Sequence, residues 1–284
     1  MADDFQFVRR PDAVIAYRIQ GTAQGRPLVL VGSPMSAAGF ATLQGFFPDR
    51  LVVTYDPRGV EHSTRAETGG VTMPEQHADD IAAVIEAVGR GPVQVFASSG
   101  GAVNALALVQ SRPELVTTFV AHEPPLAEYL PDREAVLKVV AAIRDTYLRD
   151  GFGPAMARFL DLVEREGEVP ADLADEPTSD PAAKGLPTED DGSRDDPMLS
   201  QNMVSSPSFV PNLERLRGVH TRVVVAAGVQ SRNQLTGRAA AALASALGVR
   251  LALMPSHHAG FLGGEFGQTG EPEAFAARLR ELLS

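Results

Sequence analysis

One serine stands out as a candidate nucleophile because of the very small residues around it. Ser99 lies in the run Ala97-Ser98-Ser99-Gly100-Gly101, which follows the apolar residues 93–96 and precedes the alanine-rich residues 102–109. This order predicts a strand that turns abruptly into a helix, with the serine at the turn. Only small neighbours fit such a turn, and the helix would present free N–H groups to an anion forming at the serine. The alternative is an ordinary serine–glycine turn.

A serine hydroxyl becomes a good nucleophile only when a base removes its proton, and histidine is the usual base. The chain has six histidines. His77 is expected on a solvated helix surface, and His220 precedes a strand, at the wrong end of a parallel sheet. His257 and His258 follow an expected strand, at the carboxyl end where active groups gather. The residues therefore favour one of these two, against a polar loop with two incidental histidines.

Short apolar segments alternate with amphipathic ones over most of the chain. Strands are expected at 14–19, 27–31, 51–55, 93–96, 116–121, 222–227 and 249–254, and helices at 74–88, 102–109, 235–247 and 272–283. Such alternation predicts an α/β fold, with a mostly parallel, twisted sheet covered by helices on both faces.

Residues 124–216 break this alternation. Two amphipathic helices are expected there, at 132–149 and 153–166, followed by residues 168–197, which hold ten acidic residues and two basic ones. A segment of this composition is typical of an exposed, mobile loop. We interpret residues 124–216 as an insertion that caps the sheet.

Composition excludes several classes of protein. The net charge of −11 and the isoelectric point near 5.0 argue against binding to nucleic acid or to an anionic membrane surface. The absence of cysteine excludes thiol nucleophiles, disulfides and thiolate metal sites. No apolar run approaches the length of a membrane span, and the first residues do not resemble a signal peptide. A cytoplasmic location is expected.

The order of these motifs resembles the α/β-hydrolase family over essentially the whole chain. The matching segments are Gly32-Ser33-Pro34, Asp56-Pro57-Arg58-Gly59, the turn at Ser99 and the late His258. The resemblance implies an eight-stranded, mostly parallel sheet, with a core of residues 1–123 and 217–284 and a helical cap, residues 124–216, inserted after the sixth strand. Aligning Pro255-Ser256-His257-His258 with the family's Pro-Gly-x-His pattern makes His258 the base.

The resemblance also implies an oxyanion hole of two backbone N–H groups, from Gly100 and Ser33. The family often has His-Gly before the second donor, whereas this chain has Val31-Gly32. A plain turn after the strand is the alternative for Ser33. In the family the loop that carries Asp56 and Arg58 is chiefly structural.

The acid that should orient the histidine is missing from its usual place. The family commonly has Gly-x-x-Asp after the seventh strand, but here Ser231 stands where the aspartate would be. A minority of the family places the acid after the sixth strand, which here is followed by Glu123. Pro124 is expected to restrict Glu123 to an extended backbone. We assign Glu123 as the orienting acid; a cap-docking glutamate, or catalysis without a carboxylate, are the alternatives.

These residues predict a serine hydrolase that cleaves an ester, thioester or lactone of a small to medium molecule through an acyl-enzyme. No metal or organic cofactor is expected, and the partner is a small-molecule substrate. A carbon–carbon bond hydrolase or lyase on the same scaffold is one alternative. A degenerate hydrolase that only binds a small ligand is another, motivated by the missing acid. The sequence leaves the substrate and the oligomeric state open.

Overall fold

The computed structural model describes residues 5–21, 25–66 and 70–284. Its strands are β1 Gln6–Arg9, β2 Ala13–Gly21, β3 Leu28–Val31, β4 Leu51–Tyr55, β5 Thr64–Arg65, β6 Val93–Ser98, β7 Val116–His122, β8 Arg222–Gly228 and β9 Ala252–Met254. Within this part of the chain the main sheet has the order β1-β2-β4-β3-β6-β7-β8-β9, and β5 pairs with β2 outside that order. The seven strands expected from the residues are thus present, β1 brings the number to the eight that the resemblance implies, and the two-residue β5 is a ninth.

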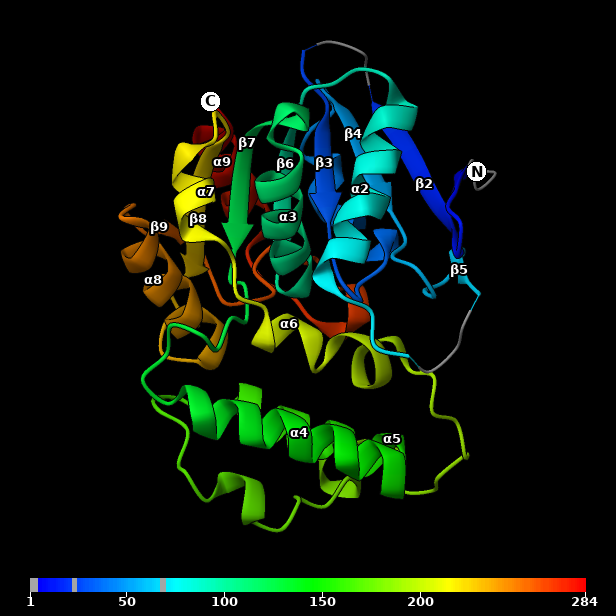
Figure 1. Ribbon diagram of the computed structural model, residues 1–284, viewed down its shortest axis with the longest axis vertical. Coiled ribbons are helices and arrows are strands. Elements are labelled where there is room, and N and C mark those ends of the chain that lie inside the picture. Colours follow the sequence, from blue (N-terminus) through cyan, green and yellow to red (C-terminus); the bar gives the residue numbers. More distant parts are fainter. Residues whose placement is uncertain (1–4, 22–24, 67–69) are drawn as a thin grey trace.

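The sheet is parallel from β4 to β9, where β4-β3, β3-β6, β6-β7, β7-β8 and β8-β9 pair in the same direction. At the other edge, β1 and β2 are antiparallel to their neighbours. The carboxyl ends of the parallel strands therefore meet at one edge of the sheet, at the bottom of Figure 1.

Helices cover both faces of the sheet, as the alternating sequence predicts. The α-helices are α1 Ala41–Gly45, α2 Pro74–Val88, α3 Gly100–Ser111, α4 Arg133–Asp150, α5 Phe152–Val163, α6 Ser205–Ser208, α7 Leu213–Gly218, α8 Leu235–Leu247 and α9 Pro272–Leu283. Buried residues of α2, α3 and α8 pack on one face, and those of α1 and α9 pack on the other. The fold is thus the expected α/β sandwich of three layers.

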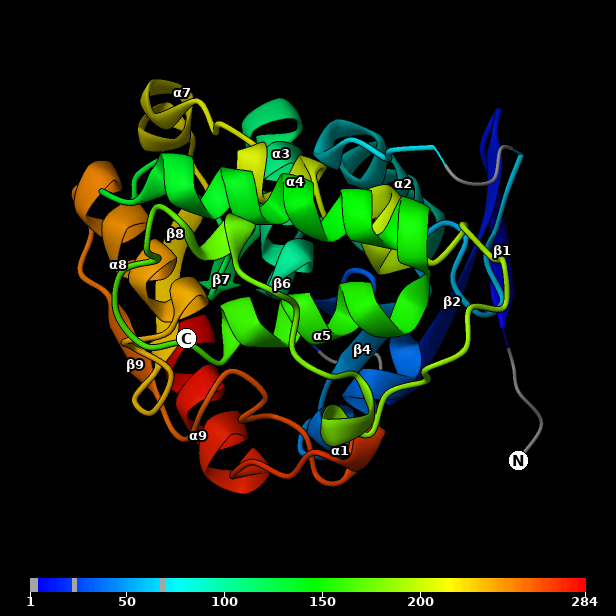
Figure 2. The same cartoon turned by 90° about the horizontal axis from the view of Figure 1, so that it is seen from below.

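The chain between β7 and β8 lies beyond the carboxyl ends of the strands (Figures 1 and 2). Helices α4 and α5 lie side by side there and share a buried apolar cluster that also includes residues of α8. A short π-helix, η5 Pro197–Asn202, and α6 lie between these helices and the sheet. Asp196 caps η5 by accepting hydrogen bonds from the N–H groups of Met198 and Leu199 at 2.9 and 2.8 Å.

Five short 3₁₀ helices complete the described elements: η1 Ala37–Phe40, η2 Pro113–Leu115, η3 Leu173–Asp175, η4 Ala182–Lys184 and η6 Glu265–Gly267. Two of them, η3 and η4, belong to the acidic segment. Arg158 of α5 holds this segment by donating to the carbonyls of Ala174 and Glu176 at 2.9 and 3.1 Å. The mobility expected for the segment stays a prediction.

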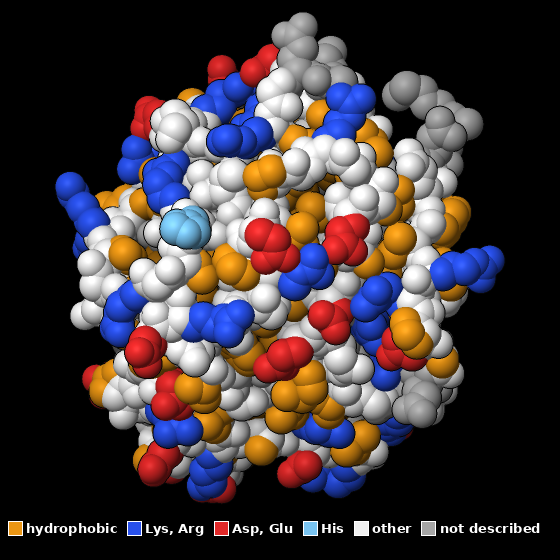
Figure 3. Space-filling view, turned by 45° about the horizontal axis from the view of Figure 1, so that its top comes forward, with side chains coloured by type: hydrophobic (Ala, Val, Ile, Leu, Met, Phe, Trp, Pro, Cys, Tyr) orange, Lys and Arg blue, Asp and Glu red, His pale blue; other side chains and the backbone are white. Residues whose placement is uncertain are grey.

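Surface charge is unevenly distributed along the chain. Residues 168–197, with ten acidic and two basic residues, contribute −8 to the net charge of −11. Elsewhere the two signs mix, and Figure 3 shows Lys and Arg interspersed with Asp and Glu over the face that it presents. None of the helices within residues 5–21, 25–66 and 70–284 has the length and apolar character needed to cross a bilayer.

Candidate active site

The turn between β6 and α3 holds Ser99 in a strained conformation. Ser99 has φ 57° and ψ −129°, which is uncommon for a residue with a Cβ atom. Its N–H donates to the carbonyl of His122 at the end of β7, at 2.9 Å. This hydrogen bond ties the turn to the neighbouring strand. The predicted sharp strand–helix turn is therefore present, with the serine at its apex.

Two glycines after Ser99 allow the loop that follows β3 to lie directly against the start of α3. A Cβ atom on Gly100 would come within 2.6 Å of the Ser33 carbonyl oxygen, and one on Gly101 within 2.4 Å of the Val31 carbonyl oxygen. Larger residues would push the two segments apart. Ser33, Ser99 and Gly100 consequently line one pocket, together with His258.

His258 forms a close pair with a buried carboxylate. Its Nδ1 lies 2.5 Å from Oε2 of Glu123. The Glu123 side chain is fully buried, whereas the His258 side chain is 36% exposed and reaches the pocket. A carboxylate on Nδ1 keeps the proton there and leaves Nε2 free to accept one. Of the two adjacent histidines, the structure brings His258 to this pair and to the pocket.

The Glu123 carboxylate accepts hydrogen bonds at both oxygens. Oε1 accepts from the Gly228 N–H at 2.8 Å and from the Ser231 hydroxyl. Oε2 accepts from the Thr236 hydroxyl at 2.8 Å, in addition to His258. Burial raises the pKa of Glu123, but the hydrogen bond and charge of His258, helped by the hydrogen bond from Ser231, lower it more. The pKa therefore lies below its usual range, and the group is ionised at neutral pH.

Ser231 occupies the place where the sequence pattern of related proteins carries the acid, and it donates to the acid that Glu123 supplies from the neighbouring strand. The loop after β8 thus supports the carboxylate without contributing one. The sequence does not signal that Ser231 and Thr236 would act as donors, because hydroxyl residues are common in such loops.

The expected extended backbone at Glu123 is wrong. Its φ is 48°, in the left-handed region, and its N–H donates to the carbonyl of Ala226 in β8 at 2.9 Å. The restriction from Pro124 is a preference of the local chain, and the four donors around the carboxylate outweigh it. Ser256, where the related pattern has glycine, also has a positive φ of 68°.

A second buried histidine lies behind the pair. The ring of His122 stacks on that of His258, with centroids 5.9 Å apart and an angle of 21° between the planes. Its Nδ1 lies 3.0 Å from the Ser98 hydroxyl, and Phe96 and Phe275 enclose it. Burial lowers the pKa of His122 to about 4, so the ring stays neutral and places no positive charge beside His258 at neutral pH.

The chain between β7 and β8 covers the pocket. Apolar side chains of α4, α5 and η5 line it opposite Ser99: Val140, Phe159, Leu162, Val163 and Met198. Ser99 and His258 therefore line a mostly apolar space.

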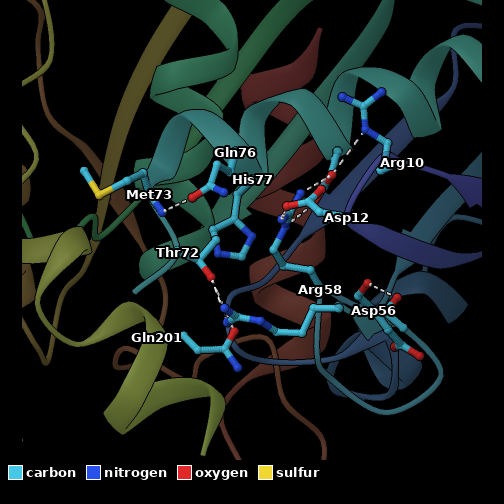
Figure 4. A network of polar contacts seen from close by, with 12 residues as sticks. Arg10, Asp12, Asp56, Arg58, Thr72, Met73, Gln76, His77 and Gln201 are labelled. Atoms are coloured by element: carbon cyan, nitrogen blue, oxygen red, sulfur yellow. Dashed lines mark hydrogen bonds and ion pairs between the residues drawn. The ribbon is translucent and has the colours of Figure 1, made fainter. Parts of the chain in front are cut away.

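Other candidate residues lie apart from this pair. His257 contacts the Thr269 carbonyl at 3.3 Å. His62 is paired with Asp56 at 3.0 Å, and its ring packs on that of Phe5. Figure 4 shows Asp56 together with the polar contacts around Arg58 and His77.

The loop of Asp56 and Arg58 is structural, as expected. The buried Arg58 guanidinium donates to Asp80 through Nε and a terminal nitrogen, at 2.7 and 2.9 Å, and to Asp12 at 2.7 Å. Asp56 accepts from the Ala37 N–H at 2.9 Å. These contacts connect the turn between β1 and β2, the start of η1, the loop after β4 and α2.

The expected solvation of His77 is wrong. The residue is only 1% exposed, because the chain around η5 covers the start of α2. Its Nε2 lies 2.8 Å from Oδ1 of Asn202. Burial lowers the pKa of His77 to about 4, and the nearby Arg58 and Arg65 lower it further while Asn202 opposes the shift. The polar sequence around His77 hid this contact, which joins residues far apart in the chain.

Comparison with known proteins identifies the family. A model described as the alpha/beta hydrolase fold matches residues 28–238, which is most of the chain. The chain belongs to the alpha/beta hydrolase family. A curated relative, the uncharacterized hydrolase YraK of Bacillus subtilis (strain 168), is 26% identical over 280 residues, covering 96% of this chain and 93% of that protein.

Solved structures of several enzymes share the fold over nearly their whole length. A thermophilic esterase from Thermogutta terrifontis has a TM-score of 0.69 at 16% identity, with 98% of this chain and 100% of that chain covered. A putative aryl esterase from Burkholderia cenocepacia has a TM-score of 0.65 at 21% identity, covering 98% and 97%. The enol-lactonase from Burkholderia xenovorans LB400 has a TM-score of 0.61 at 16% identity, covering 98% and 99%. At these identities the likeness concerns the fold.

Proposed function

We propose that the chain is a serine hydrolase that cleaves an ester, thioester or lactone of a small to medium molecule. The observation that carries the proposal is the 2.5 Å contact between the buried Glu123 carboxylate and Nδ1 of His258. This contact supports His258 as a base that is oriented by Glu123, the acid that the sequence left in doubt. It also argues against a degenerate, ligand-binding protein, because Glu123, which follows β7, places a carboxylate on His258.

In the proposed reaction the Ser99 hydroxyl attacks the carbonyl carbon while Nε2 of His258 accepts the hydroxyl proton. The N–H groups of Ser33 and Gly100 donate to the oxyanion of the tetrahedral intermediate. His258 then gives the proton to the leaving oxygen or sulfur, and an acyl group stays on Ser99. In the second half, His258 takes a proton from water, which attacks the acyl carbon; the imidazolium then returns the proton to the Ser99 oxygen as its bond to the acyl carbon breaks and the acid leaves.

Glu123 has two functions in this scheme. It holds the proton on Nδ1 of His258, and it stabilises the imidazolium that forms when Nε2 is protonated. Its own proton affinity stays low because four donors surround it.

We also propose that residues 124–216 act as a cap that selects the substrate. Their apolar side chains line the pocket opposite Ser99, and the Asp132–Arg238 ion pair, with a shortest separation of 2.5 Å, joins the start of α4 to α8 of the core. The cytoplasmic location stays a prediction from the sequence.

Covalent labelling tests this proposal. A fluorophosphonate should add once to the wild-type protein, as measured by intact mass, and peptide mapping should locate the adduct at Ser99. Ser99→Ala should abolish labelling and hydrolysis of p-nitrophenyl butyrate. Ser111→Ala is the matched control, because Ser111 ends α3 and its hydroxyl bonds to the helix backbone. Equal labelling or turnover by wild type and Ser99→Ala would contradict the proposal. Labelling without turnover of any ester, thioester or lactone would redirect it to carbon–carbon bond chemistry.

A further inference from the structure

Two chambers meet at Ser99. The inner chamber lies under α5, and its far wall carries Phe159, Leu162 and Val163. The outer chamber opens between the loop after β3, the loop after His258 and the start of α5. Ser33, Ser99 and His258 line both chambers. An ester bound at Ser99 therefore has room for its acyl part on one side and its alcohol part on the other.

The outer chamber is rich in aromatic and methionine side chains. Phe152, Phe261 and Phe266 line it together with Met35 and Met156. Such side chains offer flat, polarisable surfaces, which interact favourably with an aromatic ring. Three phenylalanines thus line this chamber, whereas Phe159 is the one phenylalanine among the described residues that line the inner chamber.

Phe266 lies at the chamber with an exposed ring and a left-handed backbone. Its side chain is 63% exposed, and its φ is 54°, a region that strongly favours glycine. One ring edge rests on η1, since a Cβ on Gly39 would lie 3.0 Å from Cε2 of Phe266. The exposed ring gains little from burial, and its backbone is strained. A ligand stacked on the ring would bury this exposed apolar surface.

The segment around Phe266 is held in place. Glu265 accepts hydrogen bonds from the Thr42 N–H at 2.7 Å and the Gly263 N–H at 2.6 Å. Glycines with positive φ, Gly264 at 134° and Gly267 at 70°, stand on either side. The ring is thus presented by a fixed turn.

Two carboxylates also face the outer chamber. Glu61, whose φ is 46°, and Asp196, which caps η5, line it. Two negative charges near one cavity disfavour an anionic ligand and tolerate a neutral or cationic one.

We propose that the outer chamber binds the aromatic ring of a neutral or cationic alcohol, so that the substrate class is esters of aromatic alcohols. This inference rests on the proposed hydrolase function. The alcohol part is assigned to the outer chamber because it must leave before water attacks the acyl-enzyme. The outer chamber is the roomier, with about 1310 Å³ of space, its mouth included, against about 630 Å³ for the inner one.

Two esters of equal acyl part test the assignment: benzyl butyrate and cyclohexylmethyl butyrate. Both are esters of primary alcohols of similar size, so the ratio of their kcat/KM values reports on the aromatic ring. The wild type should prefer the benzyl ester, and Phe266→Leu should reduce the preference about two- to tenfold, the range expected for one aromatic pair. Phe266→Gly relieves the strained backbone, folds at least as well, and should show the same loss. Phe7→Leu is the matched control, since Phe7 is 57% exposed on β1, outside the chamber.

A charge on the ring tests the expectation that the alcohol is neutral or cationic. The 4-carboxybenzyl ester should be hydrolysed more slowly than the benzyl ester, and Glu61→Gln should narrow that difference.

Three results would overturn the inference: an unchanged preference in both Phe266 variants, equal rates for the carboxylated and neutral esters in the wild type, or an aromatic preference only when the ring is in the acyl part. Failure of the proposed function itself would look different, because no ester would be hydrolysed and Ser99 would not be labelled.

Discussion

Replacing Glu123 by glutamine should leave Nε2 of His258 unable to accept the proton of Ser99, although the side chain keeps almost the same shape. The carboxylate accepts four hydrogen bonds, two at each oxygen. An amide of the same size must instead place an NH₂ group, which only donates, at one of these two positions.

The amide nitrogen should settle on the side of His258. On the other side it would meet the Gly228 N–H, a backbone donor that cannot turn away, at a site where the oxygen now lies 2.8 Å from it. The imidazole can adapt by moving its proton, and the Thr236 hydroxyl can rotate. Nδ1 would then accept from the amide, and Nε2 would carry the proton. A protonated Nε2 cannot take the proton of Ser99.

The expected loss in kcat is about 10³- to 10⁴-fold, or roughly 4–5.5 kcal/mol of transition-state stabilisation, because the wrong tautomer and the lost stabilisation of the imidazolium act together. A partial rescue is expected in the double variant Glu123→Gln, Ser231→Asp. The Ser231 hydroxyl contacts the Glu123 carboxylate, so an aspartate there brings a carboxylate to the same locality.

The assay is steady-state hydrolysis of a p-nitrophenyl ester, with urea unfolding to establish that each variant is folded. Glu114→Gln, on the surface and paired with Arg112, is the control for losing one carboxylate. A folded Glu123→Gln protein that keeps more than a tenth of the wild-type kcat would refute the reasoning, because His258 would then need no acid.

Three further changes follow from contacts described above. Gly100→Ala should lower kcat about 10²- to 10³-fold, the effect of losing one oxyanion donor, because the new Cβ would meet the Ser33 carbonyl oxygen at 2.6 Å; the rate of fluorophosphonate labelling should fall in parallel. Arg58→Met should cost about 3–5 kcal/mol in the free energy of unfolding, since it leaves the Asp80 carboxylate buried without its main partner, while kcat per folded molecule stays within about twofold; a large loss of kcat with unchanged stability would reverse this assignment. His77 has a pKa of about 4 in the folded protein against 6.5 for the free group, so the unfolded chain binds a proton at His77 more readily than the folded one. The contribution of neutral His77 to the free energy of unfolding is therefore fully present above pH 6.5 and is lost as the pH falls toward 4. Between pH 7 and pH 5 His77 should account for about 2 kcal/mol of lost stability, and His77→Gln should unfold in urea with a correspondingly weaker pH dependence.

The layers of the fold were predictable because local signals mark their boundaries. Residues 74–88, 235–247 and 272–283 were expected as helices and form α2, α8 and α9 with those bounds. Proline opens α2 and α9, and glycine in the left-handed conformation ends α2 and α8. Such signals act within one turn of the chain, so the sequence carries them directly.

Elements that depend on distant partners were not predicted. The edge strand β1 has three exposed residues of four, so it lacks the apolar pattern of a buried strand, and β5 has only two residues. A short element is expected at residues 198–203, but the π-helical geometry of η5 depends on its cap and on the packing of α4 and α5 around it. His77 was expected in solvent because its neighbours in sequence are polar, and the chain that covers it lies more than a hundred residues away.

The candidate site divides in the same way. Ser99 was found because the steric demands of a sharp turn select small residues in sequence, whereas Ser33 and Gly100 were assigned as donors from the family resemblance. Glu123 was reached by reasoning from strand order, since the end of β7 lies beside β8 and near the loop of His258. The contributions of Ser231 and Thr236 were not predicted, because a hydroxyl acquires its function here only from the carboxylate that the fold brings to it.

The π-helix η5 gives this scaffold a short route to a different specificity. Met198, in its first turn, contributes to the walls of both chambers. A π-helix holds one residue more per turn than an α-helix in the same space, so deletion of a single residue can restore α-helical geometry without breaking the segment. Such a deletion would rotate the following side chains by roughly a quarter of a turn relative to those before it. The deletion of one residue would thus change the walls of the two chambers that meet at Ser99, and Ser99, Glu123 and His258 would stay unchanged.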